Sequence, residues 1–267
     1  ENPLLMTTSA ISTATSLADP MISVIGLYKS FGDKVVLRGI DLAIGRGESL
    51  MLVGGSGAGK SVFIKHLIGL LQPDEGNVVV DGVDLTRAPP EVVLELRKKF
   101  GMTFQEGALF DSMTVGDNIA FPIRRHTDKP EKEVAARVRE CLELVRLPGI
   151  EDKMPSELSG GMRRRVGFAR AIALEPEILL FDEPTTGLDP INTAAIGDVI
   201  NQLRSALGVT AVTITHDMNL AGKIADRVGI IRRGQILLVD TPERFLESDN
   251  WFIRAFLNGE VPEEDHP

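Results

Sequence analysis

This chain of 267 residues lacks several features that mark common protein classes. Its only cysteine is Cys141, which excludes a disulfide framework and a cysteine-based zinc site. No apolar run reaches the ~18 residues of a membrane-spanning helix; Lys65 and His66, for example, interrupt the run after Ser61. The formal net charge of -9 argues against a surface built mainly for nucleic acid. We therefore expect an ordinary globular protein with no nucleic-acid partner, and we expect any membrane contact to run through another subunit.

Apolar runs and helical periodicity alternate along the chain, which predicts an α/β fold. The runs at 178–181 and 211–215 are apolar throughout, as in parallel strands buried on both faces, and 191–207 is predicted as the helix between them. Helical periodicity dominates 90–174, and the helix at 131–146 carries an apolar stripe beside Cys141, which we expect to be buried. The other expected strands are 22–27, 35–37, 42–44, 49–53, 77–80, 83–85, 102–104, 228–231 and 235–239.

Residues 54–61 read Gly-Gly-Ser-Gly-Ala-Gly-Lys-Ser, a complete phosphate-binding loop of the form G-x-x-x-x-G-K-[ST]. An apolar strand precedes the loop and a helical pattern follows it, which is the context the motif needs. The glycines allow a tight bend that turns backbone N–H groups toward the phosphates of a nucleotide. Lys60 can reach the β- and γ-phosphates, and the Ser61 hydroxyl can ligate Mg²⁺. The sequence therefore predicts a nucleotide site at this loop.

Two further segments carry groups suited to the same chemistry. Asp182 and Glu183 end an apolar strand, so the sheet edge can hold Asp182 beside the phosphate loop as a Mg²⁺ ligand. Glu183 would then orient or deprotonate the attacking water. Ser159, Gly160 and Gly161 open a helix about twenty residues earlier and can form a second phosphate-binding helix start.

With these motifs in this order, the chain resembles the ATP-binding subunit of an ABC transporter from Ile22 to about Val239. In the terms of that family, the loop at 54–61 is the Walker A motif, 158–162 the signature, 178–183 the Walker B motif and 187–189 the D-loop. The resemblance implies an α/β fold with a P-loop NTPase core and mixed sheet, an antiparallel β subdomain and a helical subdomain that carries the signature. This chain departs from the common pattern of the family at Met162, where many members have glutamine.

The resemblance also implies roles for single residues. Phe31 stands where the family places an aromatic ring under adenine, and His216 where it places a γ-phosphate contact; packing in the core and capping of a strand remain open for these two. Gln105 would sense Mg²⁺ and water, and Asp189 would couple two sites across a dimer. Glu183, His216 and Gln105 are the expected catalytic residues, and Ser61, Gln105 and Asp182 the expected metal ligands. The other expected nucleotide contacts are Phe31, Gly54, Gly55, Ser56, Gly57, Ala58, Gly59, Lys60, Ser61, Val62, Ser159, Gly160, Gly161 and Asp189.

ATP and Mg²⁺ are the implied cofactors, and two copies are expected to clamp each ATP head to tail. The phrases at 104–110, 117–122 and 155–165 look like those of ATPases paired with MCE-domain systems, the Mla-type phospholipid transporters. The implied partners are a second copy, a membrane permease and an MCE-domain lipid-binding protein. Leu109 and Phe110 are candidates for the permease contact, and burial in the domain's own core remains open for them. The implied location is the cytoplasmic face of the inner (plasma) membrane.

Alternatives stay open at this point. The cargo could be an amino acid or another solute, because cargo specificity belongs to the permease and the binding protein. A soluble ABC ATPase of DNA repair or translation is disfavoured by the single motif set and the acidic charge. We predict a flexible tail at 1–20, a nucleotide-binding domain at 21–240 with a helical subdomain at about 106–170, and a helical extension with an acidic tail at 241–267.

Overall fold

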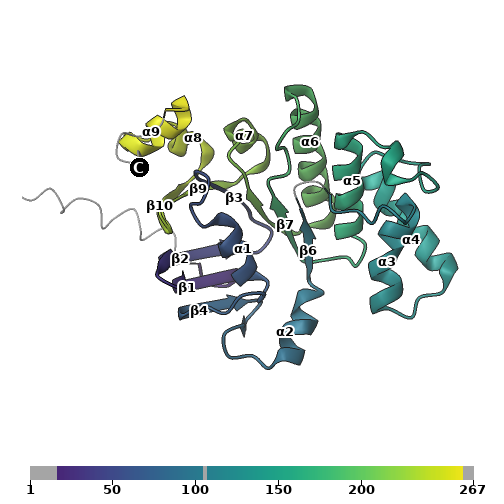
Figure 1. The fold of residues 1–267 in the computed structure, drawn as a ribbon, viewed down its shortest axis with the longest axis horizontal. Helices are drawn as coiled ribbons and strands as arrows, with labels where there is room; N and C mark the ends of the chain where they lie inside the picture. The colour runs from purple at the N-terminus through teal and green to yellow at the C-terminus, as the bar shows by residue number, and fades with distance from the viewer. Residues whose placement is uncertain (1–16, 105–106, 261–267) are drawn as a thin grey trace, which may run out of the picture. The chain divides into compact units, whose positions relative to one another are not determined.

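The computed structural model describes residues 17–104 and 107–260 of the chain (Figure 1). The described residues divide into two compact units, one made of 17–89 and 216–260 and the other of 90–215. Gln105 and most of the predicted N-terminal and acidic tails lie outside the described residues. The division into tail, nucleotide-binding domain and C-terminal extension stays a prediction.

The first unit contains an antiparallel sheet with the strand order β2-β1-β4-β5. Its strands are β1 (Pro20–Phe31), β2 (Lys34–Gly45), β4 (Glu75–Val80) and β5 (Val83–Asp84). The separate strands expected at 35–37 and 42–44 are wrong, because β2 is continuous. Arg38 and Asp41 interrupt its apolar pattern without ending it, since the strand has solvent-facing positions. Gly39 has φ +74°, and a Cβ there would lie 2.9 Å from Cε2 of Tyr28, so only glycine fits beside this ring.

The same unit holds a second set of strands, in which β3 (Ser49–Val53) pairs parallel with β9 (Arg227–Arg232) and β9 pairs antiparallel with β10 (Gln235–Asp240). All five residues of β3 are buried, so it forms core rather than surface. The unit's helices are α1 (Lys60–Leu67), η3 (Met218–Leu220), α7 (Ala221–Ile224), α8 (Pro242–Leu246) and α9 (Trp251–Asn258). The segment predicted as a helical extension therefore contains two helices, α8 and α9.

The second unit is built on three parallel strands, β6 (Phe100–Thr103), β7 (Ile178–Asp182) and β8 (Thr210–Ile214). Every residue of β8 and the first four of β7 are buried, as their continuous apolar runs predict. The helix α6 (Pro190–Leu207) connects β7 to β8. The remaining helices are α2 (Pro90–Arg97), α3 (Val115–His126), α4 (Glu131–Leu144), η2 (Pro155–Glu157) and α5 (Gly160–Ala171).

The helix α4 buries the stripe predicted from the sequence, which includes Val134 and Leu142. It ends two residues earlier than the periodicity predicts, because Arg146 adopts the left-handed conformation with φ +58°. Cys141 is fully buried on the same helix, and this burial raises the pKa of its thiol to about 11. Along the described residues we find no helix that combines the length and apolar character needed to cross a membrane.

Candidate functional site

The phosphate loop joins β3 to α1 in the first unit, and two of its glycines are required by the space around them. Gly54 has φ +159°, and a Cβ at this position would lie 2.4 Å from the carbonyl oxygen of Ile231. Gly59 has φ +106° and would place a Cβ 2.8 Å from Cδ2 of Leu37. Any side chain at either position would displace the loop from its neighbours. The glycine spacing in the sequence thus reflects close packing as well as flexibility.

Lys60 starts α1 and curls back over the loop that precedes it. Its Nζ donates to the carbonyl oxygens of Gly54 at 2.6 Å and Gly55 at 3.1 Å. Ser61 follows as an exposed residue in the first turn of α1, where helix N–H groups favour an anion. The ammonium and hydroxyl groups are therefore placed at the start of a helix, as a bound triphosphate with its Mg²⁺ requires. No cluster of three or more His, Cys, Asp or Glu with metal-binding geometry occurs within 17–104 or 107–260.

Two other predicted contact residues belong to the first unit. Phe31 is the last residue of β1 and is 48% exposed, so the structure does not bury its ring in the core. Nζ of Lys29 lies 5.6 Å from the centroid of this ring. His216 is an exposed residue two positions after the end of β8. Both side chains are accessible to a ligand, and their roles stay predictions.

Asp182 and Glu183 stand at the carboxyl end of β7 in the second unit, as the sequence predicts. The backbone of Glu183 has φ +49°, which is uncommon for a residue with a side chain. Its N–H donates to the carbonyl oxygen of Ile214 at 2.8 Å, which fixes the chain where it leaves the strand. Backbone strain of this kind persists where surrounding bonds determine the conformation, and it is concentrated at functional sites.

The carboxylate of Glu183 has a partner that the sequence analysis did not identify. The Thr186 hydroxyl donates to Oε2 of Glu183 at 3.1 Å. The carbonyl oxygen of Thr186 accepts from the guanidinium of Arg164, which is buried on α5. The sequence offered no signal for this role, because Arg164 stands within a run of three arginines at 163–165. The signature helix is therefore hydrogen-bonded to the turn that follows Glu183.

Ser159 is the N-cap of α5, and its Oγ accepts from the N–H of Met162 at 3.2 Å. Gly160 lies in open space, and both Ser159 and Gly160 are exposed. Because Met162 contributes its backbone N–H to this cap, glutamine is not needed at that position to form it. The predicted start of the helix is thus confirmed, while contact with a nucleotide stays a prediction.

Asp189 is the N-cap of α6 and accepts from the N–H groups of Ile191 and Asn192, both at 3.0 Å. The Asn192 side chain donates to the same carboxylate at 2.5 Å. These bonds, those from Asn192 first, lower the pKa of Asp189 below its ordinary value. Asp189 is therefore held as an ionised, exposed carboxylate at a helix start.

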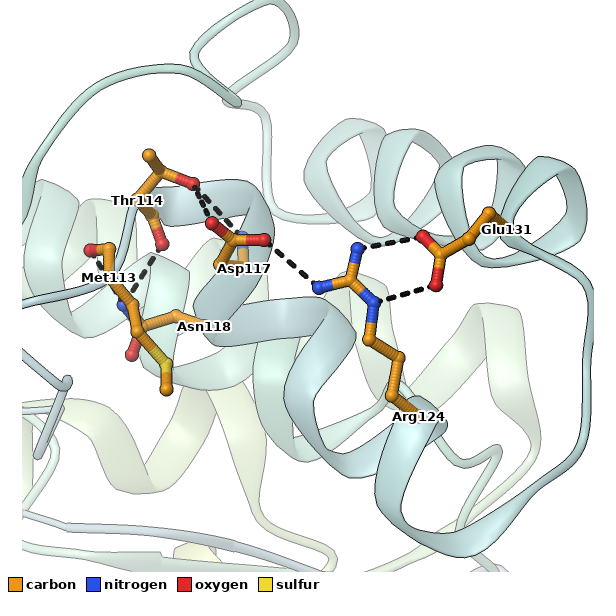
Figure 2. A network of polar contacts seen from close by, with 6 residues as sticks. All are labelled: Met113, Thr114, Asp117, Asn118, Arg124 and Glu131. Carbon is orange, nitrogen blue, oxygen red and sulfur yellow. Dashed lines mark hydrogen bonds and ion pairs between the residues drawn. The ribbon is translucent and has the colours of Figure 1, made fainter.

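The loop before α3 is organised by one buried side chain, Asn118, as Figure 2 shows in part. Its Oδ1 accepts from the N–H of Phe110 at 2.8 Å, and its Nδ2 lies within hydrogen-bond distance of the carbonyl oxygens of Phe110, Met113 and Thr114. Phe110 is consequently presented at the surface, 44% exposed, with its ring centroid 5.1 Å from that of Phe121.

Figure 2 also shows Arg124, which ties α3 to the start of α4. Its guanidinium pairs with Asp117 at 3.0 Å and with both carboxylate oxygens of Glu131, at 2.9 Å and 2.7 Å. The bonds from Arg124 lower the pKa of the Glu131 carboxyl. These ion pairs are exposed, so they align the two helices more than they stabilise the fold.

Comparison with known proteins identifies the family. Residues 37–186 match the family model described as ABC transporter. The chain belongs to the ABC transporter family. The matched region extends from β2 through the phosphate loop and the signature to the turn that contains Thr186, and it covers more than half of the chain.

Two groups of ABC relatives are similar over most of this chain. The probable ribonucleotide transport ATP-binding protein mkl of Mycobacterium bovis is 45% identical over 89% of this chain and 66% of its own length. This chain therefore corresponds to about two thirds of that relative. The intermembrane phospholipid transport system ATP-binding protein MlaF is 41% identical in Haemophilus influenzae, over 90% of this chain and 91% of MlaF, and 39% identical in Escherichia coli K12. The resemblance to Mla-type ATPases is thereby confirmed.

Solved structures of ABC proteins confirm the predicted fold class. The structure of cbiO1 from Clostridium perfringens, part of the ABC transporter complex cbiONQ, aligns with a TM-score of 0.80 and 28% identity, over 90% of this chain and 95% of cbiO1. The dimeric post-hydrolysis state of the ATP-binding cassette MJ0796, bound to ADP and Pi, aligns with a TM-score of 0.75 and 29% identity, over 83% of this chain and 99% of that cassette.

Proposed function

We propose that this chain binds and hydrolyses ATP with Mg²⁺ as the motor subunit of an ABC transporter. The observation that carries the proposal is the phosphate loop, in which Lys60 and Ser61 begin α1 behind tightly packed glycines. A side chain at Gly54 or Gly59 would disturb this loop, because neither position has room for a Cβ. Membership of the ABC family supports the same activity.

In this proposal each site residue has a defined task. Lys60 neutralises the β- and γ-phosphates, and Ser61, Gln105 and Asp182 supply oxygen ligands to Mg²⁺, which polarises the phosphates. Glu183 holds the attacking water, takes its proton and is itself oriented by Thr186. His216 contacts the γ-phosphate, and Phe31 stacks on adenine through its exposed ring.

The working unit is proposed to be a head-to-tail homodimer. Ser159 and Gly160 are exposed at the start of α5, where they can close on a nucleotide held by a second copy. Ile191, two residues after Asp189, is 82% exposed, an apolar side chain that a second copy would cover. A solved cassette that is 29% identical to this chain is a dimer, which supports the same arrangement.

The permease contact is proposed at the loop that Asn118 organises. Phe104, Phe110 and Phe121 are each more than 40% exposed, although large apolar side chains usually avoid water. Phe121 also borders a hollow of about 360 Å³, whose other lining residues are Met113, Asp117, Arg124 and Arg125. An apolar helix of a permease with acidic ends would fit it. Bound there, the chain is peripheral to the cytoplasmic face of the inner (plasma) membrane.

The cargo is proposed to be phospholipid, passed to or from an MCE-domain lipid-binding protein. Support comes from the two MlaF proteins, whose lengths match this chain almost end to end. Another solute is the second candidate, because mkl is described as a probable ribonucleotide transport protein and is slightly more identical.

The test is to purify the Glu183→Gln variant with its permease from native membranes in detergent, then identify proteins and lipids by mass spectrometry. This variant should trap ATP because it keeps the shape of the side chain and removes the base. An MCE-domain protein and phospholipid would support the lipid assignment. A solute-binding protein would retain the motor and replace the cargo. Rapid steady turnover in this variant would contradict the role of Glu183.

A further inference from the structure

The C-terminal helix α9 is attached to the β9–β10 hairpin through one arginine. Arg232, the last residue of β9, lies over two rings of α9. Its Cζ is 4.2 Å from the centroid of Phe252 and 4.9 Å from that of Trp251. The two rings meet edge to face with their centroids 5.9 Å apart. Because Phe252 is buried, this cation–π contact is partly shielded from water, which strengthens it. We name Arg232, Trp251 and Phe252 the aromatic clamp.

The hairpin held by the clamp also touches the phosphate loop near both of its ends. The carbonyl oxygen of Ile231, one residue before the clamp arginine, packs so closely on Gly54 that a Cβ there would be 2.4 Å away. The N–H of Gly234 donates to the carbonyl oxygen of Ala58 at 3.2 Å. The hairpin therefore fixes the first glycine of the loop and the residue before its last glycine.

Between these two attachments the loop borders a cavity of about 500 Å³. The cavity is lined by the loop at 55–58, by Arg232 and Arg233 of the hairpin, and by Phe252 and Phe256 of α9. Residues 55–57 of the loop are exposed, so this stretch has room to move toward α9. The loop's position depends on the hairpin, whose strand β9 pairs with β3 and whose Gly234 carbonyl oxygen accepts from the N–H of Arg38 at 2.8 Å. The clamp adds a contact at Arg232, where β9 ends and the turn begins.

We propose that the aromatic clamp positions the phosphate loop for nucleotide binding, with Arg232 as a positioning residue and α9 as part of the nucleotide site's support. The inference rests on the proposed binding of ATP. Loss of the clamp should loosen the end of β9 at Arg232 and the turn that follows it, let the loop sample the cavity and weaken nucleotide binding. The hydrolytic step should be unaffected once nucleotide is bound, because Glu183 lies on another element.

The experiment uses Trp251, the only tryptophan of the chain, as an internal reporter. The full-length protein is titrated with Mg·ADP, and binding is followed by tryptophan emission and independently by equilibrium dialysis. We expect a saturable emission change in the unaltered chain. In Arg232→Gln the dissociation constant from dialysis should rise about tenfold, equivalent to ~1.4 kcal/mol. In steady-state turnover the same variant should raise KM for ATP and leave kcat near its original value.

Two variants serve as controls. Arg254→Gln removes an arginine of the same helix that pairs with Asp249 at 2.8 Å and is not part of the clamp, so it should bind as the unaltered chain does. Arg232→Lys keeps a cation for the rings and should recover part of the lost affinity. If Arg232→Gln does not fold, Trp251→Phe and Trp251→Leu are compared by dialysis instead. Only the leucine variant removes the aromatic ring, so only that variant should bind Mg·ADP more weakly.

The outcomes separate the inference from the proposed function. Normal Mg·ADP binding by Arg232→Gln, with no emission change in the unaltered chain, would overturn the clamp and leave nucleotide binding intact. Absence of Mg·ADP binding to the unaltered chain in dialysis would overturn both. An equal fall of kcat and kcat/KM in Arg232→Gln would refute a role limited to binding.

Discussion

Replacing Asn118 by alanine should destabilise the protein by an amount that the hydrogen bonds define. Two of its four contacts are backed by other bonds, because the Phe110 carbonyl also accepts from Met113 N–H at 3.1 Å and the Thr114 carbonyl from Asn118 N–H at 2.9 Å. For the Phe110 N–H and the Met113 carbonyl, the described part of the chain provides no second bond of this kind. Each buried polar group without a bond costs roughly 1–3 kcal/mol. Since this loop is partly exposed, we expect a total loss of about 2 kcal/mol.

Urea denaturation of the Asn118→Ala variant measures this loss directly, and the melting temperature should fall by roughly 4–8 °C for a chain of this size. Asn201→Ala on the exposed face of α6 is the matched control and should change stability by less than about 0.5 kcal/mol. Asn118→Asp keeps the shape but places a carboxylate against carbonyl oxygens, so it should be worse than alanine at neutral pH. A loss below about 0.5 kcal/mol in Asn118→Ala would refute the reasoning.

Three further predictions concern the second unit. Thr186→Val removes the hydroxyl that bonds to Glu183 and should lower kcat for ATP hydrolysis by roughly tenfold. Thr186→Ser keeps the hydroxyl and should keep the rate. An unchanged rate in the valine variant would exclude this orienting role. Burial raises the pKa of Cys141 from 9.0 to about 11, so the folded state keeps its proton to higher pH than the unfolded state. Stability should therefore fall between about pH 9 and 11 by roughly 2–3 kcal/mol, and Cys141→Ala should flatten that decline; an identical pH profile would contradict it. Gly167→Ala would set a Cβ 2.9 Å from Cα of Gly107 and should cost ~1–3 kcal/mol in thermal unfolding, so full stability would show that this contact relaxes freely.

The phosphate loop and the strands β3, β7 and β8 were predictable because their information is local. Short apolar runs that are buried on all sides leave few alternatives, and the glycines at 54 and 59 stand within one motif. The continuity of β2 was missed because charged residues on a solvent-facing position look like a break in the sequence. A local pattern cannot show that pairing with β1 continues past them.

The supporting residues of the site could not be predicted, because their roles arise from contacts between distant segments. Arg164 meets a carbonyl oxygen 22 residues away, and Arg232 meets rings on a helix that follows the next strand. Neither arginine belongs to a sequence motif that would single it out. In the sequence Asn118 looks like an ordinary polar residue of a helix, and only the folded loop shows that it is buried.

The left-handed backbone conformation of Glu183 lowers the stability of the fold at a residue that catalysis requires. A side chain in this conformation costs on the order of 1–3 kcal/mol, and glycine would relieve it. A Glu183→Gly chain should therefore melt at a higher temperature than the unaltered one while being unable to activate water. Selection for thermal stability alone would favour such inactive sequences. Arg146, Glu175 and Arg233 share this backbone conformation, and what distinguishes Glu183 is that its carboxylate also accepts from the Thr186 hydroxyl.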